Sequence, residues 1–300
     1  MNIRNLQYLV ALSDHEHFGK AAEECFVSQP ALSIQINKLE EYLGVKLLER
    51  TNKSVALTAV GLIITEQARQ ILSQVSELKE IAQTAKDPFN GELKLGIFPT
   101  LAPYLFPYII PKLSAIFPNL LIYLIEEKTE LLMEKLKQGK IHAAITALPM
   151  NESGMTTTPL FEEEFLLTIS HSHALAKRKT IKHEELDSKN ILILEDGHCM
   201  RDQVLSFCHQ ANATETLHFR ATSLEALRHM VAAGSGMTLM PRLATEGCKL
   251  ATFIPFTSPK PMRTIGITSR KCSTKKILLD ELSQQIKKIM AKTKLVNVID

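Results

Sequence analysis

The sequence of 300 residues has no long uninterrupted apolar run, and its first twenty residues, MNIRNLQYLVALSDHEHFGK, contain no cleavage-like site. We therefore expect neither a membrane-spanning segment nor a secretory signal, and we expect a cytoplasmic protein. A large charge of one sign is also absent. The net charge is only +3 at pH 7, which neither requires nor excludes a nucleic-acid partner.

Cysteines are few and odd in number, and none forms a CxxC pair or a Cys/His cluster with zinc-like spacing. This pattern argues against a structural disulfide framework, and we expect no metal and no cofactor. The five cysteines are Cys25, Cys199, Cys208, Cys248 and Cys272. We expect Cys25, Cys248 and Cys272 to be reduced thiols that pack as small hydrophobic residues.

The first sixty residues are expected to form three helices and a hairpin, because apolar residues recur at helical spacing and then in two short runs. The segments are NLQYLVALSDHE, GKAAEECF, VSQPALSIQINKLEEYLG and VKLLERTNKSVALT. In the third helix Ser28 is a good N-cap, Pro30 lies where an early proline is tolerated, and Gly44 is placed to end the helix. Its apolar face consists of Leu32, Ile36 and Leu39.

A short helix, a tight turn and a second helix with a polar front predict a helix-turn-helix, in which the second helix enters the major groove of double-stranded DNA. We expect Ser28, Gln29, Pro30 and Ser33 at the tip of that helix, with Gln29 and Ser33 facing base edges or phosphates. Arg50 and Lys53 on the hairpin are expected to reach phosphates. A plain helical bundle is the alternative, since residues 1–62 carry six basic and seven acidic side chains.

The segment AAEECFVSQPALSIQINKLEEYLGVKLLER resembles the winged helix-turn-helix of LysR-type transcriptional regulators. The resemblance implies a multidomain α/β protein: a winged helix-turn-helix, a long linker helix, and a two-lobed sensor domain like the periplasmic binding proteins. The expected boundaries are 1–58 for DNA binding, 59–90 for the linker helix and hinge, and 91–300 for the regulatory domain. Within the last, lobe I comprises about 91–163 and 267–300, and lobe II about 164–266.

The expected linker helix has a narrow apolar stripe, which is typical of a two-helix coiled coil. The positions are Ile64, Ala68, Ile71, Val75, Leu78, Ala82 and Ala85, in alternating steps of four and three. A homodimer would hold two recognition helices at a fixed spacing; an ordinary surface helix is the alternative. Asp87-Pro88 and Asn90-Gly91 are expected to end the helix.

From Glu92 onward strand-like and helix-like segments alternate, which predicts parallel sheets with helices on both faces. About 210 residues are too many for one such sheet, so we expect two subdomains. By the resemblance, the chain crosses between the lobes near residues 163 and 266.

The segment GHCMRDQVLSFC places two cysteines nine residues apart in an expected helix, where they lie on opposite faces and cannot bridge unless the helix comes apart. We expect the helix N-terminus to lower the pKa of Cys199, with His198 and Arg201 adding positive charge or hydrogen bonds. Asp202 is expected to orient a small molecule or to hold Arg201. Cys208 is expected to be a buried, inert thiol. On the residues alone, two unrelated core thiols remain the alternative.

LEDGHCMRDQVLSFC, together with HFRATSLEALRHMVAAGSGMTLMP, resembles the hydrogen-peroxide-sensing members of the LysR family. The resemblance implies that Cys199 is the peroxidatic thiol and that Cys208 resolves its sulfenic acid into a reversible disulfide. It also implies a peroxide pocket formed by Thr100, Thr129, His198, Arg201 and Asp202. The implied function is activation of oxidative-stress genes by a DNA-bound dimer or tetramer, with RNA polymerase and a thiol reductant as partners.

Two other functions compete with this one. The first is a metabolite-responsive LysR-type regulator with incidental cysteines, in which residues 98–100 and Thr129 supply a polar cleft. The second is a thiol peroxidase with Cys199 as nucleophile. A DNA-reading module and a dimerising helix have no place in such an enzyme, so we expect that the protein is not an enzyme.

Overall fold

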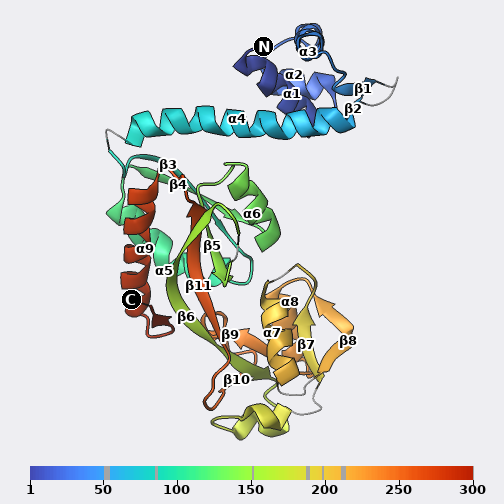
Figure 1. The fold of residues 1–300 in the computed structure, drawn as a ribbon. Helices are drawn as coiled ribbons and strands as arrows, with labels where there is room; N and C mark the ends of the chain where they lie inside the picture. Colours follow the sequence, from blue (N-terminus) through green and yellow to red (C-terminus); the bar gives the residue numbers. More distant parts are fainter. Residues whose placement is uncertain are drawn as a thin grey trace. The chain divides into compact units, whose positions relative to one another are not determined.

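The computed structural model describes residues 1–50, 55–84, 87–150, 152–186, 190–197, 199–210 and 214–299. The chain forms two compact units, Met1–Ala85 and Lys86–Asp300, and Figure 1 labels their elements. Within the described ranges, no helix has both the length and the apolar character needed to cross a bilayer.

The first unit consists of helices around a small apolar core, with a two-stranded hairpin. Its elements are α1 (Ile3–His15), α2 (Phe18–Glu24), α3 (Gln29–Leu43), β1 (Leu48–Arg50), β2 (Val55–Leu57) and α4 (Ala59–Thr84). Strands β1 and β2 pair antiparallel, so the predicted hairpin is confirmed. Residues 51–54, which join the two strands in the sequence, lie outside the described residues.

Helix α3 forms as its sequence predicts. The Ser28 side chain caps it by accepting a hydrogen bond from the backbone N–H of Ala31, and Pro30 lies in the first turn. Gly44 ends the helix with φ +68°, a left-handed conformation that glycine adopts without steric cost. The predicted apolar face is confirmed, since Leu32, Ile36 and Leu39 are all buried.

Helix α4 uses part of its apolar stripe within the same chain. Ile64 and Ala68 of this stripe pack against the core of the first unit, as does Leu72 beside it, and Ala68 is only 1% exposed. A side chain that is already buried cannot also form a seam with a second helix, so the prediction that Ala68 lies in a coiled-coil seam is wrong. Farther along, Ile71 and Leu78 are 41% and 67% exposed and stay predicted contacts of a partner helix.

The second unit is built on an eight-stranded sheet with the order β10-β6-β11-β5-β3-β4, in which β9 and β12 also pair with β6. A separate two-stranded sheet is formed by β7 and β8. The strands are β3 (Gly91–Ile97), β4 (Leu120–Glu126), β5 (Ala143–Leu148), β6 (Met155–Ile169), β7 (Asn190–Leu194), β8 (Thr214–Ala221), β9 (Thr238–Pro241), β10 (Thr252–Pro255), β11 (Met262–Arg270) and β12 (Asn297–Val298). The helices are α5 (Ala102–Ile116), α6 (Thr129–Lys137), α7 (Cys199–Gln210), α8 (Leu224–Ala232) and α9 (Lys276–Ala291).

Two separate apolar cores define two lobes in this unit. Phe161 and Ile265 belong to the core of the first lobe, whereas Phe165 and Phe256 belong to the core of the second. The single strand β6 therefore contributes to both cores. The expected crossing points at residues 163 and 266 lie within β6 and β11.

The prediction of parallel sheets is correct for part of the unit and wrong for the rest. Strand β3 pairs parallel with β4 and β5, and β7 pairs parallel with β8. In contrast, β6 and β11 pair antiparallel with each other. The reason is topological: β6 carries the chain out of the first lobe and β11 brings it back, so the two strands run side by side in opposite directions (Figure 1).

A buried carboxylate connects α3 to the hairpin of the first unit. Glu40 accepts hydrogen bonds from the backbone N–H groups of Leu47 and Leu48 at 2.8 and 3.2 Å, and it pairs with Lys46 at 2.8 Å. Burial alone would raise the pKa of Glu40, but these hydrogen bonds and the charge of Lys46 outweigh it and lower the pKa below its ordinary value.

We expect Glu40→Ala to lower the free energy of unfolding of the first unit by about 1–3 kcal/mol, because two buried backbone donors lose their acceptor. Since the folded-state pKa is depressed, this stabilisation is present at neutral pH and is lost as the pH falls through the folded-state pKa. Chemical denaturation of both proteins at neutral and acidic pH measures the difference. Glu41→Ala, at an exposed position of the same helix, is the control; an equal loss in both variants would contradict the assignment.

Candidate functional site

Both candidate redox cysteines lie in α7, which begins at Cys199. Cys208 follows nine residues later, about 13.5 Å along the helix axis and on the opposite face. A disulfide requires Cα atoms within about 7 Å of each other. All five cysteines are thiols in this structure. The prediction that the reduced segment is helical, with its two thiols too far apart to bridge, is therefore confirmed.

The two thiols belong to different cores. Cys199 packs against the core of the first lobe, although α7 itself is part of the second lobe. Cys208 is 2% exposed in the core of the second lobe, as its apolar neighbours Val204 and Phe207 predict. A bond between the two sulfurs therefore requires that at least one thiol leave the core against which it packs.

Three side chains act on the thiol of Cys199, two from other elements of the fold and one from α7 itself. Thr129 is the first residue of α6, Arg263 lies on β11, and Asp202 is one turn along α7; each acts on the Cys199 thiol. Arg263 also donates to the hydroxyl and carbonyl oxygens of Thr100, both at 3.3 Å. Within the described part of the chain, no group of three or more His, Cys, Asp or Glu side chains could hold a metal ion.

Burial raises the pKa of Cys199 above its ordinary value. The positive charge of Arg263, the nearby Thr129 hydroxyl and a hydrogen bond donated by the backbone N–H of Met200 all lower this pKa, whereas the charge of Asp202 raises it. The opposing effects do not compensate for desolvation, so the prediction of a lowered pKa at the helix N-terminus is wrong. The Thr129 hydroxyl is buried and makes no hydrogen bond of normal geometry to any described residue.

The positive charge beside Cys199 comes from an arginine that the sequence did not identify. Arg263 and Glu163 form an ion pair at 2.7 Å, and both side chains are fully buried. Glu163 also accepts a hydrogen bond from the backbone N–H of Leu243 at 2.6 Å. The guanidinium lies 5.5 and 5.7 Å from the ring centroids of Phe98 and Phe165. Because 100 residues separate the partners, no local pattern indicates the pair.

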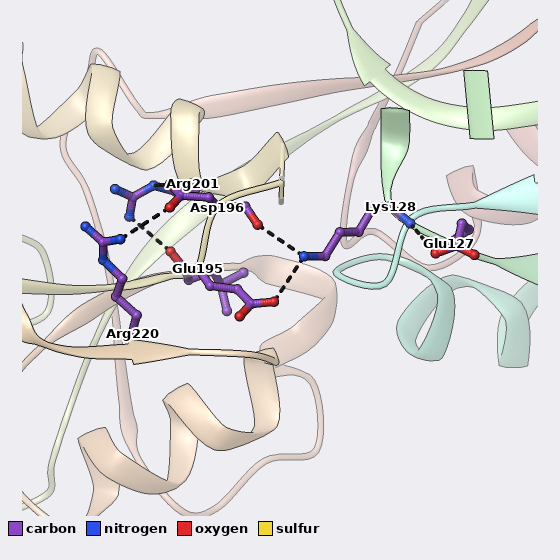
Figure 2. Close-up of polar contacts among 7 residues, drawn as sticks. Glu127, Lys128, Glu195, Asp196, Arg201 and Arg220 are labelled. Atoms are coloured by element: carbon purple, nitrogen blue, oxygen red, sulfur yellow. Dashed lines mark hydrogen bonds and ion pairs between the residues drawn. The ribbon is translucent and has the colours of Figure 1, made fainter. Parts of the chain in front are cut away.

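The predicted pocket residues on α7 have different positions. Arg201 is largely buried and pairs through Nε with Asp196 at 2.9 Å, and it donates to the carbonyl of Leu194 at 3.1 Å. Arg220 on β8 pairs with the same carboxylate at 3.2 Å (Figure 2). Arg201 therefore ties α7 to the loop that precedes it, and its role in a peroxide pocket stays a prediction. His198 lies outside the described residues.

Four of the six predicted DNA-contacting residues lie at the N-terminal end of α3. Ser28, Gln29 and Pro30 are exposed and Ser33 is half-buried. The backbone of Arg50 lies in β1, whereas the Arg50 side chain and the whole of Lys53 lie outside the described residues. Contact of these residues with DNA stays a prediction.

Two family descriptions match consecutive parts of the chain. Residues 3–62 match the bacterial regulatory helix-turn-helix protein of the lysR family, and residues 86–290 match the LysR substrate binding domain. These matches correspond to the helix-turn-helix unit and to the two-lobed unit described above. The chain belongs to the LysR family of transcriptional regulators.

Within this family the chain is similar to proteins named for hydrogen peroxide. It is 46% identical over 290 residues to the DNA-binding transcriptional dual regulator OxyR of Escherichia coli K12, covering 96% of this chain and 95% of that protein. It is also 46% identical over 293 residues to the hydrogen peroxide-inducible genes activator of Dickeya chrysanthemi, covering 97% and 96%. The structure of a cysteine-to-aspartate variant of full-length OxyR from Pseudomonas aeruginosa matches with a TM-score of 0.77 at 37% identity, covering 96% of this chain and 95% of that one.

We expect alkylation of Cys199 by iodoacetamide to speed up about tenfold per pH unit between pH 6 and 8, because the thiolate is the reactive form and the pKa of Cys199 is raised above the ordinary value of about 8.5. Site-resolved mass spectrometry of native protein measures the rate. The same cysteine in urea-unfolded protein is the control, and its pH profile should lie on the acidic side of the native one. A native profile that levels off below neutral pH would contradict the raised pKa.

Proposed function

We propose that this protein is a hydrogen-peroxide-sensing transcription regulator that activates oxidative-stress genes and is switched by a reversible Cys199–Cys208 disulfide. The observation that carries the proposal is the placement of two thiols in two different cores at opposite ends of one helix. The names of its relatives support peroxide as the signal. We place the protein in the cytoplasm, where a thiol reductant resets it.

The chemistry begins at Cys199. Its thiolate attacks one oxygen of hydrogen peroxide, the O–O bond breaks, and the released hydroxide takes a proton to leave as water. The sulfur becomes a sulfenic acid and has lost two electrons. We assign Thr100, Thr129, His198, Arg201 and Asp202 to the pocket that holds the peroxide, and the buried Thr129 hydroxyl is suited to donate a hydrogen bond to it.

Cys208 completes the oxidation. Its thiol loses a proton and attacks the sulfur of the Cys199 sulfenic acid, the S–O bond breaks, water leaves, and the S–S bond forms. Helix α7 has to open for this step, since its geometry separates the two sulfurs. The bridge closes a ten-residue loop, and on a chain-entropy estimate such a cross-link lowers the conformational entropy of the unfolded chain by an amount worth about 2.7 kcal/mol. Each 1.4 kcal/mol of opposing strain raises the reduction potential by about 30 mV, which keeps the bond reducible by thiols.

The refolded segment then changes the surfaces that the regulatory domains present to one another. In our proposal the protein acts as a homodimer or homotetramer, because LysR-type recognition helices read two half-sites at a fixed spacing. Rearrangement of the regulatory domains alters how the DNA-bound assembly meets RNA polymerase. The DNA contacts are assigned to Ser28, Gln29, Pro30, Ser33, Arg50 and Lys53.

The redox proposal predicts a specific trapped intermediate. After a brief micromolar peroxide pulse, wild-type protein should contain a Cys199–Cys208 disulfide, whereas Cys208→Ser should stop at Cys199 sulfenic acid or a mixed disulfide. Thiol mapping by mass spectrometry distinguishes these products. Amide exchange across residues 199–220 should rise in the oxidised wild type, because α7 must open, and should change little in residues 1–58.

Cys199→Ser is the matched variant, and it should remain unmodified at position 208 under the same pulse. Oxidation without a change in amide exchange would contradict the opening of α7. Peroxide consumption should be about stoichiometric with protein. Sustained turnover in the presence of a reductant would instead identify a thiol peroxidase.

The DNA-binding assignment predicts that Gln29→Ala weakens sequence preference by about 1–3 kcal/mol, because an amide that reads a base edge is lost. Fluorescence anisotropy with specific and unrelated duplexes measures this change. Lys53→Ala is the contrasting variant; it should weaken binding to every sequence and flatten the salt dependence by about one unit of slope. Unchanged affinity and preference in Gln29→Ala would exclude α3 as the recognition helix.

A further inference from the structure

A lysine from the first lobe holds the loop that leads into α7. Nζ of Lys128 donates to Oε1 of Glu195 at 3.0 Å and to the backbone carbonyl of Asp196 at 3.1 Å (Figure 2). The next residue, Gly197, has φ +87°, and a Cβ added there would lie 3.1 Å from Cδ of Lys128. The lysine therefore contacts residues 195–197 through both its charged end and its aliphatic stem.

Lys128 occupies a position that joins this loop to the reactive thiol. It immediately precedes Thr129, the first residue of α6, and its side chain does not cap that helix. The start of α6 thus contacts the second lobe twice, with Lys128 on the loop 195–197 and Thr129 on Cys199. Glu127 fixes the backbone at this point by accepting from the N–H of Lys128 at 3.3 Å.

The loop is in turn fixed to α7 and β8. Both Arg201 and Arg220 bind the carboxylate of Asp196, at 2.9 and 3.2 Å. The loop and the first turn of α7 are therefore held together, and Cys199 lies only two residues beyond Gly197. A contact that holds the loop against the first lobe consequently also holds Cys199 there.

We infer that Lys128 is a positioning residue for the redox switch: it keeps Cys199 beside Thr129 and Arg263 in the reduced protein, and its contacts are lost when Cys199 moves to meet Cys208. This inference rests on the proposed function. Lys128 thereby favours the reduced form over the disulfide. Because its ion pair with Glu195 is half-exposed, at 37% and 39%, the effect corresponds to about a threefold change in the thiol–disulfide equilibrium, and salt weakens it.

The test is a redox titration of the full-length chain in glutathione buffers. In these buffers the thiols of Cys199 and Cys208 react with one glutathione disulfide, which gives the Cys199–Cys208 bond and two molecules of reduced glutathione. Mass spectrometry quantifies the bond in each buffer. Lys128→Met retains the stem and removes the charge, and it should raise the ratio of disulfide to dithiol about threefold. Lys128→Arg retains the charge and should restore the wild-type ratio. In 1 M salt, wild type and Lys128→Met should converge.

Lys137→Met is the matched control. Lys137 is the last residue of α6, the helix that Lys128 precedes, and it pairs with Glu152 at 2.8 Å; the two side chains are 51% and 36% exposed. This pair lies within the first lobe. Its removal should leave the equilibrium unchanged. An unchanged ratio in Lys128→Met, or an equal shift in Lys137→Met, would overturn the inference while leaving the proposed function intact. Failure of the wild type to form the disulfide would instead defeat the proposed function, and the inference with it.

Discussion

The ion pair between Arg263 and Glu163 is the interaction on which the regulatory unit depends. It joins β11 to β6, the two strands that connect the lobes, and neither side chain is exposed. A buried pair of this kind is costly to break, because removal of one partner leaves an uncompensated charge in the interior. Arg263 also holds Thr100 and supplies positive charge to Cys199. The geometry of the thiol site is thus set by the same contact that fixes the crossing between the lobes.

The sequence predicted features that are encoded over a few residues. The cap at Ser28, the stop at Gly44 and the helical spacing of the two α7 cysteines each depend on near neighbours, and the structure confirms all three. It did not predict contacts between distant segments. Glu163 and Arg263 are 100 residues apart, and Lys128 and Glu195 are 67 apart. In its own segment, each of these four charged residues lies in no local pattern that would indicate its distant partner.

Two wrong predictions have the same physical origin. The helix N-terminus was expected to lower the pKa of Cys199, but desolvation against the first lobe dominates and raises it. Ala68 was expected in an intermolecular seam, but α1 and its neighbours already bury it. In both cases tertiary burial, which cannot be read from local spacing, outweighs a local effect. The pKa of Cys199 accordingly depends on burial and on groups from other elements more than on its own helix.

The burial of Ala68 has a mechanical consequence. Helix α4 is 26 residues long, or about 39 Å. Its first half shares an apolar core with α1. Helix α1 is in turn linked to α3, because the side chain of Asn5 donates a hydrogen bond to that of Gln35 at 3.0 Å. The first part of α4 therefore cannot rotate about its own axis without turning α3 with it. A small rotation of the C-terminal part of α4 about the helix axis therefore also changes the orientation of α3.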